Sequence, residues 1–376
     1  MTQGVPSSFQ WLPTGEAALE AMLNAIHAAR ESVRLETYIY ADDPVGQQFR
    51  SALVQAQQRG VRVQVLVDAF GSIYLGENFW TPLTNWGGQF RRFNPLALNR
   101  WSYRNHRKLL VCDNAVAFIG GCNISHEYAG DGVTRGWRDL GLRITGPLAE
   151  ELGDSFDAFF ARADFRHKRL QRLRKPANTT AAGHNWKLLL RCPGRHHAEF
   201  KRALAQDLAG AQSVRIISAY FLPTWRLRME LRRIARWGGQ VQLILAAKSD
   251  VPLARLASRH LYRSFLRAGV EIYEYQPQVL HAKMIIIDDI VYAGSANLDT
   301  RSLQINYELL VRIADATLAA EARELFAGDL AHCRRVERRA WRKSRTFWNK
   351  LKEEVAYYFL ARLDLYVARR QLKMLR

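Results

Sequence analysis

The chain has few cysteines, few acidic residues and no long apolar runs, and each shortage excludes a class of protein. Its four cysteines, Cys112, Cys122, Cys192 and Cys333, form no CxxC pair. A disulfide framework, a zinc ribbon and a thioredoxin-type site are therefore not expected, and the thiols suit a reducing compartment. No apolar run reaches the roughly 18 residues of a membrane span. The N-terminus lacks the features of a secretory signal, so any membrane contact is expected to be peripheral.

Acidic residues are outnumbered by basic ones. The 376 residues include 55 Lys+Arg and 35 Asp+Glu, a formal net charge of +20. This excess predicts an anionic partner, which could be nucleic acid, an acidic membrane surface or a phosphate-bearing substrate. Hydrophobic residues make up 48%, enough for a packed core, and the length predicts two domains or one large double unit.

The sequence contains an internal duplication. Residues 17–40 and 198–221 both begin with the apolar spacing of a helix and then enter a strand at a shared Ser-Val-Arg. Residues 60–67 and 238–245 also match, as a helix end followed by a strand rich in branched aliphatic residues. This alternation of helices and strands in each half predicts an α/β fold in which helices cover the sheets.

The duplication and two changes in composition predict the domain organisation. It comprises a first repeat at 1–160, a basic segment and linker at 161–185, a second repeat at 186–330 and a basic, aromatic tail at 331–376. In the tail, one helical stripe is predicted to contain Trp341, Trp348, Leu351, Val355 and Tyr358. Basic residues beside such aromatics suit a helix that lies on an anionic membrane, and docking onto the domain or a partner helix is the alternative. On the membrane interpretation, deleting the tail weakens vesicle binding more than hydrolysis of a soluble diester.

One motif occurs once in each half. His-x-Lys-x-x-x-x-Asp is formed first by His106, Lys108 and Asp113, and again by His281, Lys283 and Asp288. Each copy is followed by Gly-x-x-Asn, which ends at Asn123 in the first half and at Asn297 in the second. A single match would be a modest signal, but two copies at matching places of a duplication are hard to attribute to chance.

The motif residues are predicted to meet at one edge of each sheet. Strand-forming residues follow each lysine, each aspartate falls in a tight turn, and a returning strand leads to the asparagine. The two-residue period of a strand puts histidine and lysine on one face. Two halves that face each other would thus bring two imidazoles, two ammonium groups and two amides to one site.

That set of groups suits a phosphodiester. Ammonium and amide groups can hold the non-bridging oxygens, which gain charge at a pentacoordinate phosphorus. One imidazole can attack phosphorus, and the other can protonate the leaving oxygen. Because the lysines supply positive charge, and no clustered metal-ligand set is recognisable, we expect no metal and no other cofactor.

These motifs resemble those of the phospholipase D superfamily, whose members carry two His-x-Lys-x4-Asp motifs. Within it, the chain is most similar to bacterial cardiolipin synthases of the short type that lacks N-terminal membrane spans. The similarity rests on residues 36–40, 106–110, 118–124, 137–140 and 294–302, and extends over about 15–315. It implies two tandem phospholipase D-like α/β repeats, with mixed sheets flanked by helices, that face each other across one active site, plus a C-terminal basic helical tail.

The resemblance also implies a ping-pong transfer through a phosphohistidine. His106 would be the nucleophile, and His281 the acid and then the base that activates the incoming alcohol. From the residues alone, the two halves are nearly equivalent, so this assignment rests on the resemblance. The residues that would bind phosphate are Lys108, Lys283, Asn123 and Asn297.

Four carboxylates receive supporting roles from the resemblance. Asp139 and Glu308 would orient the histidines, although Asp139 is shorter than the glutamate found in many relatives. Asp113 and Asp288 complete the catalytic motifs and would be structural, at the turns.

The predicted function is a phosphatidyltransferase that makes cardiolipin from two phosphatidylglycerols and releases glycerol. A phospholipase D-type hydrolase and a nuclease of the same superfamily are the alternatives. The expected partners are anionic phospholipids and the membrane surface rather than nucleic acid, since no nucleic-acid-binding module is recognisable. The expected location is peripheral, on the cytoplasmic face of the bacterial inner membrane. The oligomeric state is left open.

Overall fold

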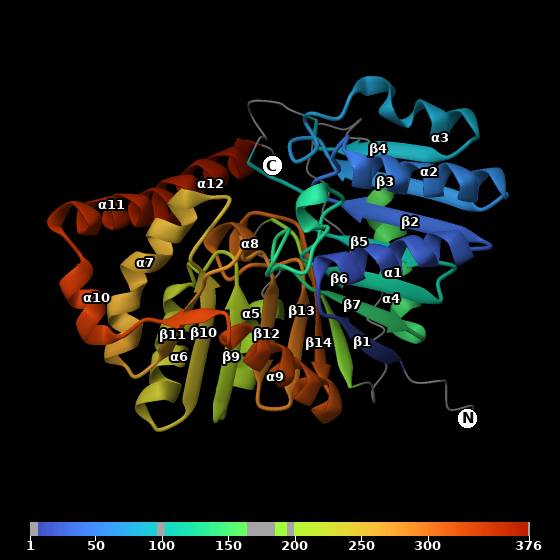
Figure 1. Cartoon of the computed structure of the whole chain (residues 1–376). Coiled ribbons are helices and arrows are strands. Elements are labelled where there is room, and N and C mark those ends of the chain that lie inside the picture. The colour runs from blue at the N-terminus through green and yellow to red at the C-terminus, as the bar shows by residue number, and fades with distance from the viewer. Residues whose placement is uncertain (1–6, 96–101, 164–184, 194–198, 375–376) are drawn as a thin grey trace.

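In the computed structural model of this protein, two α/β repeats pack together, each around one mixed β-sheet (Figure 1). The structure describes residues 7–95, 102–163, 185–193 and 199–374. Most of the segment predicted at 161–185, with its basic stretch, lies outside these residues. The domain boundaries drawn from the sequence stay predictions.

The first repeat has a sheet of seven strands within the described residues. They are β1 (Ser8–Leu12), β2 (Ser32–Thr37), β3 (Arg62–Asp68), β4 (Gln89–Phe93), β5 (Leu109–Cys112), β6 (Val116–Gly120) and β7 (Gly141–Thr145). Its helices are α1 (Gly15–Ala28), α2 (Pro44–Gln58), α3 (Thr81–Asn85) and α4 (Pro147–Phe160), with 3-10 turns at Glu77–Trp80 and His126–Tyr128. β2, β3 and β4 run parallel, and the other neighbours run antiparallel.

The second repeat has a sheet of eight strands within the described residues. They are β8 (Trp186–Arg191), β9 (Ser213–Ser218), β10 (Gln240–Ala246), β11 (Glu271–Tyr275), β12 (Lys283–Ile287), β13 (Ile290–Gly294), β14 (Glu308–Ala314) and β15 (Cys333–Arg335). Its helices are α5 (Glu199–Leu208), α6 (Trp225–Arg236), α7 (Pro252–Arg267), α8 (Thr300–Gln304) and α9 (Ala316–Leu330). β9, β10 and β11 run parallel, as β2, β3 and β4 do in the first repeat.

The two sheets have the same topology, which confirms the duplication and the mixed α/β class. Their strand orders are β4-β3-β2-β5-β6-β7-β1 and β11-β10-β9-β12-β13-β14-β8, and β15 is added at the edge of the second. The shared Ser-Val-Arg opens β2 and β9, as expected. Gly60 and Gly238 have φ of 88° and 93°, a conformation that suits glycine, and each lies between a helix and the next strand.

Among the described residues, each repeat has an apolar cluster of its own, and a third cluster is shared by both repeats. A single apolar cluster contains residues of both, among them Phe156 of α4, Ile286 of β12 and Phe326 of α9. The indole N–H of Trp11, in β1, also donates to the carbonyl oxygen of Leu318, in α9, at 3.3 Å. The shared core therefore fixes how the repeats sit against each other.

The motif aspartates occupy the hairpin turns that the sequence predicted. Asp113 and Asp288 have φ of 55° and 48°, in the left-handed region that aspartate tolerates in tight turns. The Asp113 carboxylate accepts from the main-chain N–H groups of residues 30–32, at 2.8–2.9 Å. Asp288 accepts in the same way from the N–H groups of residues 212 and 213. Each aspartate thus holds the start of the neighbouring strand, at the far end of its hairpin from the motif histidine.

The tail differs from the single stripe predicted for it. It forms α10 (Arg338–Ser344), α11 (Phe347–Tyr358), a π-helical turn at Phe359–Leu363 and α12 (Asp364–Met374). The chain is extended at Arg345, and the Thr346 side chain caps α11. Trp341 consequently lies on a separate helix, buried against Tyr262, and does not share the stripe. The other four residues of the predicted stripe are exposed on α11.

One face of the tail is docked onto the second repeat, while the other face carries the exposed aromatics. Figure 1 shows α11, in red, beside α7, and these two helices are in contact. Tyr357 stacks on His260 of α7 with ring centroids 4.6 Å apart, and Ala356 is buried. Docking onto the domain, one of the two tail interpretations drawn from the sequence, is therefore confirmed for one face of α11, while the exposed face leaves the membrane interpretation a prediction. Within the described residues, no helix is long and apolar enough to cross a membrane.

Candidate active site

Two short main-chain bridges join the repeats beside the motif histidines. In one bridge, Asn105 pairs with Tyr307, and the His106 N–H donates to the Tyr307 carbonyl oxygen at 3.0 Å. In the other, Arg138 pairs with Leu280, and the His281 N–H donates to the Arg138 carbonyl oxygen at 2.8 Å. The residue after Tyr307 is Glu308, and the residue after Arg138 is Asp139. Each bridge therefore brings one of these carboxylates next to the histidine of the opposite repeat.

Glu308 and Asp139 are the two carboxylates that the family resemblance predicted to orient the histidines. Nδ1 of His106 lies 3.1 Å from the carboxylate of Glu308, and Nδ1 of His281 lies 2.6 Å from that of Asp139. Both carboxylates are fully buried, and the histidines are 8% and 4% exposed. Each repeat thus supplies the partner of the other repeat's histidine, an arrangement we call the crossed carboxylates. With Nδ1 engaged, each imidazole keeps Nε2 for chemistry.

Burial governs the protonation of the two imidazoles. It lowers the pKa of His106 to about 4, since desolvation outweighs the opposing effect of Glu308. Burial and the nearby Lys283 also lower the pKa of His281. At neutral pH both rings are therefore neutral before substrate binds, so one can act as a nucleophile, and the negative charge of a bound phosphodiester favours protonation of the other, which can then act as an acid.

The two motif lysines lie in the same cluster. The Lys108 ammonium donates to the carbonyl oxygen of His106 at 2.9 Å, and that of Lys283 donates to the carbonyl oxygen of His281. Burial lowers the pKa of Lys108 to about 7, and the charge of Lys283 contributes to this shift. Glu308 and Asp139 oppose the shift of Lys108. Charged groups of both repeats thus act on one another, as expected for one shared site.

The two asparagines anchor the segment that follows the first strand of the duplicated pattern. The Asn123 side-chain oxygen accepts from the Ile39 N–H at 3.1 Å, and that of Asn297 accepts from the Tyr220 N–H at 3.4 Å. The Asn123 amide also donates to the Tyr128 hydroxyl at 2.6 Å. Each amide nitrogen has two hydrogens, so this anchoring leaves donors for an anionic oxygen.

Aromatic rings pack against both histidines, and the sequence reasoning did not assign these contacts. The Tyr38 ring lies 5.0 Å from that of His106. Tyr128 and Trp137 lie 5.2 and 5.7 Å from the ring of His281. The position of Trp137, two residues before Asp139, is a signal that could have placed it in the site. The rings shield the imidazoles from water and limit their rotation.

A carboxylate at the edge of the site was also missed. Asp250 is exposed and accepts a hydrogen bond from the Tyr220 hydroxyl at 2.5 Å. Its charge acts to raise the pKa of His281, Lys283 and Tyr38, which places it beside groups of both repeats. No sequence pattern marks Asp250, because it follows β10 in an irregular segment.

A buried network supports the segment that leads into His106. The Asn105 side chain donates to Glu36 at 2.8 Å, and its main-chain N–H donates to Asp68 at 2.7 Å. Arg107 forms an ion pair with Glu36 at 3.1 Å, and Arg104 forms one with Asp68 at 3.4 Å. All these side chains are at least nine-tenths buried, so the network holds the segment rigidly.

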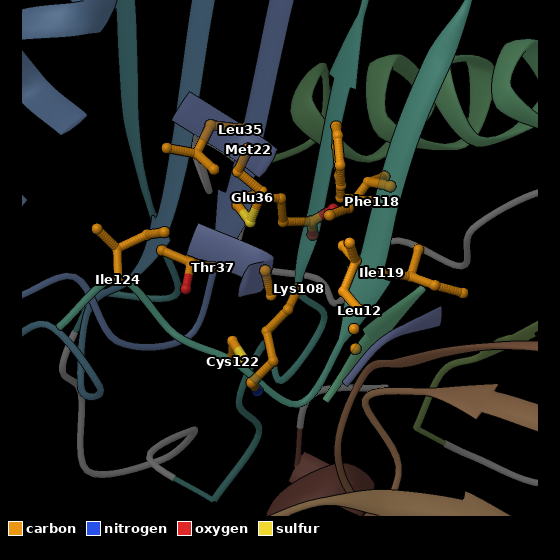
Figure 2. A pocket seen from close by; sticks show the side chains of 14 residues that line it. Leu12, Met22, Leu35, Glu36, Thr37, Lys108, Phe118, Ile119, Cys122 and Ile124 are labelled. Carbon is orange, nitrogen blue, oxygen red and sulfur yellow. The ribbon is translucent and has the colours of Figure 1, made fainter. Parts of the chain in front are cut away.

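A small cavity lies behind Lys108, between β2, β5, β6 and α1. Figure 2 shows its side chains, which are mostly apolar, with the Lys108 chain running alongside Cys122. Its volume is about 20 Å³, room for about one water molecule. A lipid headgroup does not fit there, so the cavity is not the substrate site. Cys122 is buried, and burial raises the pKa of its thiol, as expected for an apolar filler rather than a nucleophile.

One group of side chains within the described residues has ligand atoms close enough to hold a metal ion. It consists of Asp43, His126 and Glu127 and includes none of the motif residues. Asp43 caps α2 and accepts from both the main chain and the ring of His126. These hydrogen bonds account for the group without an ion.

Comparison with known proteins agrees with this geometry. Residues 22–160 and 204–330 match the family model described as cardiolipin synthase, PLD-like domain. Cardiolipin synthase B of Escherichia coli strain K12 is 34% identical over 372 residues, covering 94% of this chain and 88% of that protein. Cardiolipin synthase 1 of Bacillus cereus is 28% identical over 355 residues, covering 88% and 68%.

The fold has relatives among solved structures. A phosphatidylserine synthase of Haemophilus influenzae Rd KW20 superposes with a TM-score of 0.74 over 96% of this chain and 94% of its own, at 16% identity. That likeness shows the shared fold. Because the family model covers both repeats and the relatives match along nearly the whole chain, this protein belongs to the family of cardiolipin synthases with phospholipase D-like domains.

Proposed function

We propose that this protein is a phosphatidyltransferase that makes cardiolipin from two phosphatidylglycerol molecules and releases glycerol. The crossed carboxylates carry the proposal, because they orient two imidazoles, one from each repeat, within a single buried cationic cluster. Membership of the cardiolipin synthase family supports the lipid substrate.

The first half of the reaction forms a phosphohistidine. Nε2 of His106 attacks the phosphorus of one phosphatidylglycerol, and the bond from phosphorus to the glycerol oxygen breaks. His281 gives its proton to that oxygen, so glycerol leaves neutral. Glu308 accepts the Nδ1 hydrogen of His106 throughout and stabilises the positive charge that the ring acquires.

The second half transfers the lipid group. His281, now neutral, takes the proton of a glycerol hydroxyl on the second phosphatidylglycerol, and that oxygen attacks phosphorus. The bond from phosphorus to Nε2 of His106 breaks, which frees the enzyme and cardiolipin. Asp139 stabilises His281 when it is protonated, as Glu308 does for His106.

The phosphate oxygens are held by positive and amide donors. The residues proposed for this are Lys108, Lys283, Asn123 and Asn297. Their donors stabilise the extra negative charge of the pentacoordinate phosphorus, a task that needs no metal ion here. Asp113 and Asp288, although part of the motif, act through the main chain at the opposite ends of their hairpins.

The proposed location is peripheral, on the cytoplasmic face of the bacterial inner membrane. The exposed aromatic face of α11, which includes Trp348 and Tyr358, supports contact with a bilayer surface. The four free cysteines, three of them buried, support a reducing compartment on that side.

The product profile tests the proposed reaction. Purified protein is incubated with phosphatidylglycerol labelled in the acyl chains, and the lipids are separated. We expect labelled cardiolipin together with an equal amount of glycerol, and neither product from a His106→Ala variant.

Other products would identify the alternatives. Phosphatidic acid as the sole lipid product would mean that water replaces the acceptor, and that the enzyme is a hydrolase. Cleavage of DNA without turnover of any phospholipid would mean a nuclease of the same superfamily.

A further inference from the structure

A second pocket lies on the outer side of the second repeat, between α7, α10 and the start of α11. Its volume is about 460 Å³. The residues that line it are Arg263, Leu266, Arg267, Arg338, Arg339, Trp341, Arg342, Arg345 and Lys350. None of them belongs to the active site, and none is acidic. Seven cationic side chains thus surround one space.

Most of these cations have no acidic partner among the described residues. Arg345 forms an ion pair with Glu353, but no Asp or Glu within the described chain lies within ion-pair distance of the other lining cations. Surface arginines of other parts of the protein are often paired, as Arg312 is with Asp207 and Arg323 is with Asp289. Gathering unpaired like charges around one pocket is unfavourable unless an anion neutralises them.

One wall of the pocket is formed by Trp341. Trp341 is 7% exposed, and its buried indole N–H has no hydrogen-bond partner. The ring itself is fixed, with the Arg259 guanidinium 4.2 Å from its centroid. Trp341 thus gives the cationic pocket a rigid aromatic wall.

Exposed aromatic rings stand next to this pocket. Phe347 and Trp348 begin α11 and are 70% and 66% exposed, and Lys350 of the pocket follows two residues later. The apolar face continues along α11 through Val355 and Tyr358. Aromatic side chains beside arginines are typical of a surface at the headgroup level of a bilayer. A soluble phosphate compound would not require them.

We propose that this pocket binds the phosphate of an anionic phospholipid headgroup, as a second lipid site that holds α11 against the membrane. The cationic lining recognises the phosphate, and the aromatic face of α11 enters the interface beside it. The site goes beyond the proposed function, because its occupant undergoes no reaction there.

The test compares two variants with the same loss of charge. The first replaces three pocket arginines, Arg267→Gln, Arg338→Gln and Arg342→Gln. The matched control is Arg62→Gln, Arg226→Gln and Arg236→Gln, which are exposed and lie outside the pocket. Binding of the full chain is measured by sedimentation with phosphatidylcholine vesicles that do or do not contain phosphatidylglycerol or cardiolipin.

We expect the pocket variant to bind anionic vesicles on the order of 100-fold more weakly, and the control to lose much less. Turnover of a soluble, short-chain phosphatidylglycerol should be unchanged in both, which shows that the fold and the active site are intact. If the proposed reaction fails in the wild type, the vesicle comparison still decides this inference.

Three results would overturn the second lipid site. Equal losses in the two variants would mean that net charge alone drives binding. Unchanged vesicle binding together with a pocket-dependent affinity for inorganic phosphate or pyrophosphate would assign the pocket to a soluble anion. A pocket-dependent loss of DNA binding, with vesicle binding intact, would assign it to nucleic acid.

Discussion

The carboxylate of Glu308, in the second repeat, lies 3.1 Å from Nδ1 of His106, in the first. The reverse pairing holds between Asp139 and His281, at 2.6 Å. Neither repeat therefore contains a complete histidine–carboxylate pair of its own. The site therefore forms only when both repeats are folded and packed. The main-chain bridges at Tyr307 and Arg138 set the positions of Glu308 and Asp139, the residues that follow them in the chain.

Loss of either crossed carboxylate should reduce turnover rather than binding. Glu308→Gln and Asp139→Asn keep the shape of the side chain but remove the charge that stabilises a protonated histidine. We expect kcat to fall about 10²- to 10⁴-fold, with little change in KM. Steady-state kinetics with a soluble phosphatidylglycerol measures both constants. Glu321→Gln, at an exposed position of α9, is the control. A fall in kcat of less than about tenfold would remove the orienting role.

The two histidines should differ in whether a covalent intermediate forms. His106→Ala removes the proposed nucleophile, so no lipid group should become attached to the protein. His281→Ala keeps the nucleophile and removes the acid and base. With a donor whose leaving group needs no protonation, such as a p-nitrophenyl ester, it should accumulate phosphatidyl-His106. Intact-protein mass spectrometry detects the added mass. Attachment to the His106→Ala variant instead would reverse the two roles.

Activity should decline at alkaline pH as Lys108 loses its charge. Its pKa is lowered to about 7, so the ammonium is present below that pH and is lost as the pH rises through it. On the acid side, His106 stays neutral down to about 4. The profile of kcat/KM, which reports the free enzyme, should therefore fall above about 7 as Lys108 loses its charge and below about 4 as His106 is protonated. Because His281 must be protonated to act as the acid and burial lowers its pKa too, its deprotonation adds to the alkaline decline. Lys108→Arg keeps its charge at high pH, so the alkaline decline should move upward. An unmoved decline would show that another group causes it.

Removal of metal ions should leave the reaction unchanged, because the lysines supply the positive charge at the phosphate. Purified enzyme is dialysed against EDTA and assayed for cardiolipin formation in metal-free buffer. We expect the same rate as before dialysis. Strong inhibition that added Mg²⁺ or Ca²⁺ reverses would refute the account based on lysines.

The tail should matter for catalysis as well as for membranes. Asp364 of α12 forms an ion pair with Arg301 of α8 at 2.6 Å, and the Gln371 side chain accepts from the Ser102 N–H at 3.2 Å. Ser102 leads into the segment of His106. Deletion of residues 331–376 should therefore impair turnover even of a soluble diester, in addition to the loss of vesicle binding expected from the sequence.

A point substitution avoids unfolding the tail. Asp364→Asn should lower kcat for the soluble diester several-fold with the melting temperature nearly unchanged. Tyr358→Ser, on the exposed face of α11, should leave that kcat intact. Equal effects of the two substitutions would contradict a coupling between α12 and the site.

The sequence alone was enough to predict the repeats, the strands around the motifs and most of the candidate site. Its motifs recur with strand and turn signals around them, and a strand period of two residues decides which side chains share a face. For that reason His106, Lys108 and their counterparts could be placed at matching sheet edges. The hairpin turns at Asp113 and Asp288 could be predicted too, since turn chemistry is local.

Only the tertiary structure decided which partners meet. The crossing of Glu308 to His106, the position of Asp250 and the burial of Trp341 depend on contacts between segments far apart in the chain, which no local pattern encodes. The tail illustrates the difference. Its apolar residues were visible in the sequence, but one helix cap at Thr346 and the packing of α11 on α7 determined which of them are buried and which face solvent.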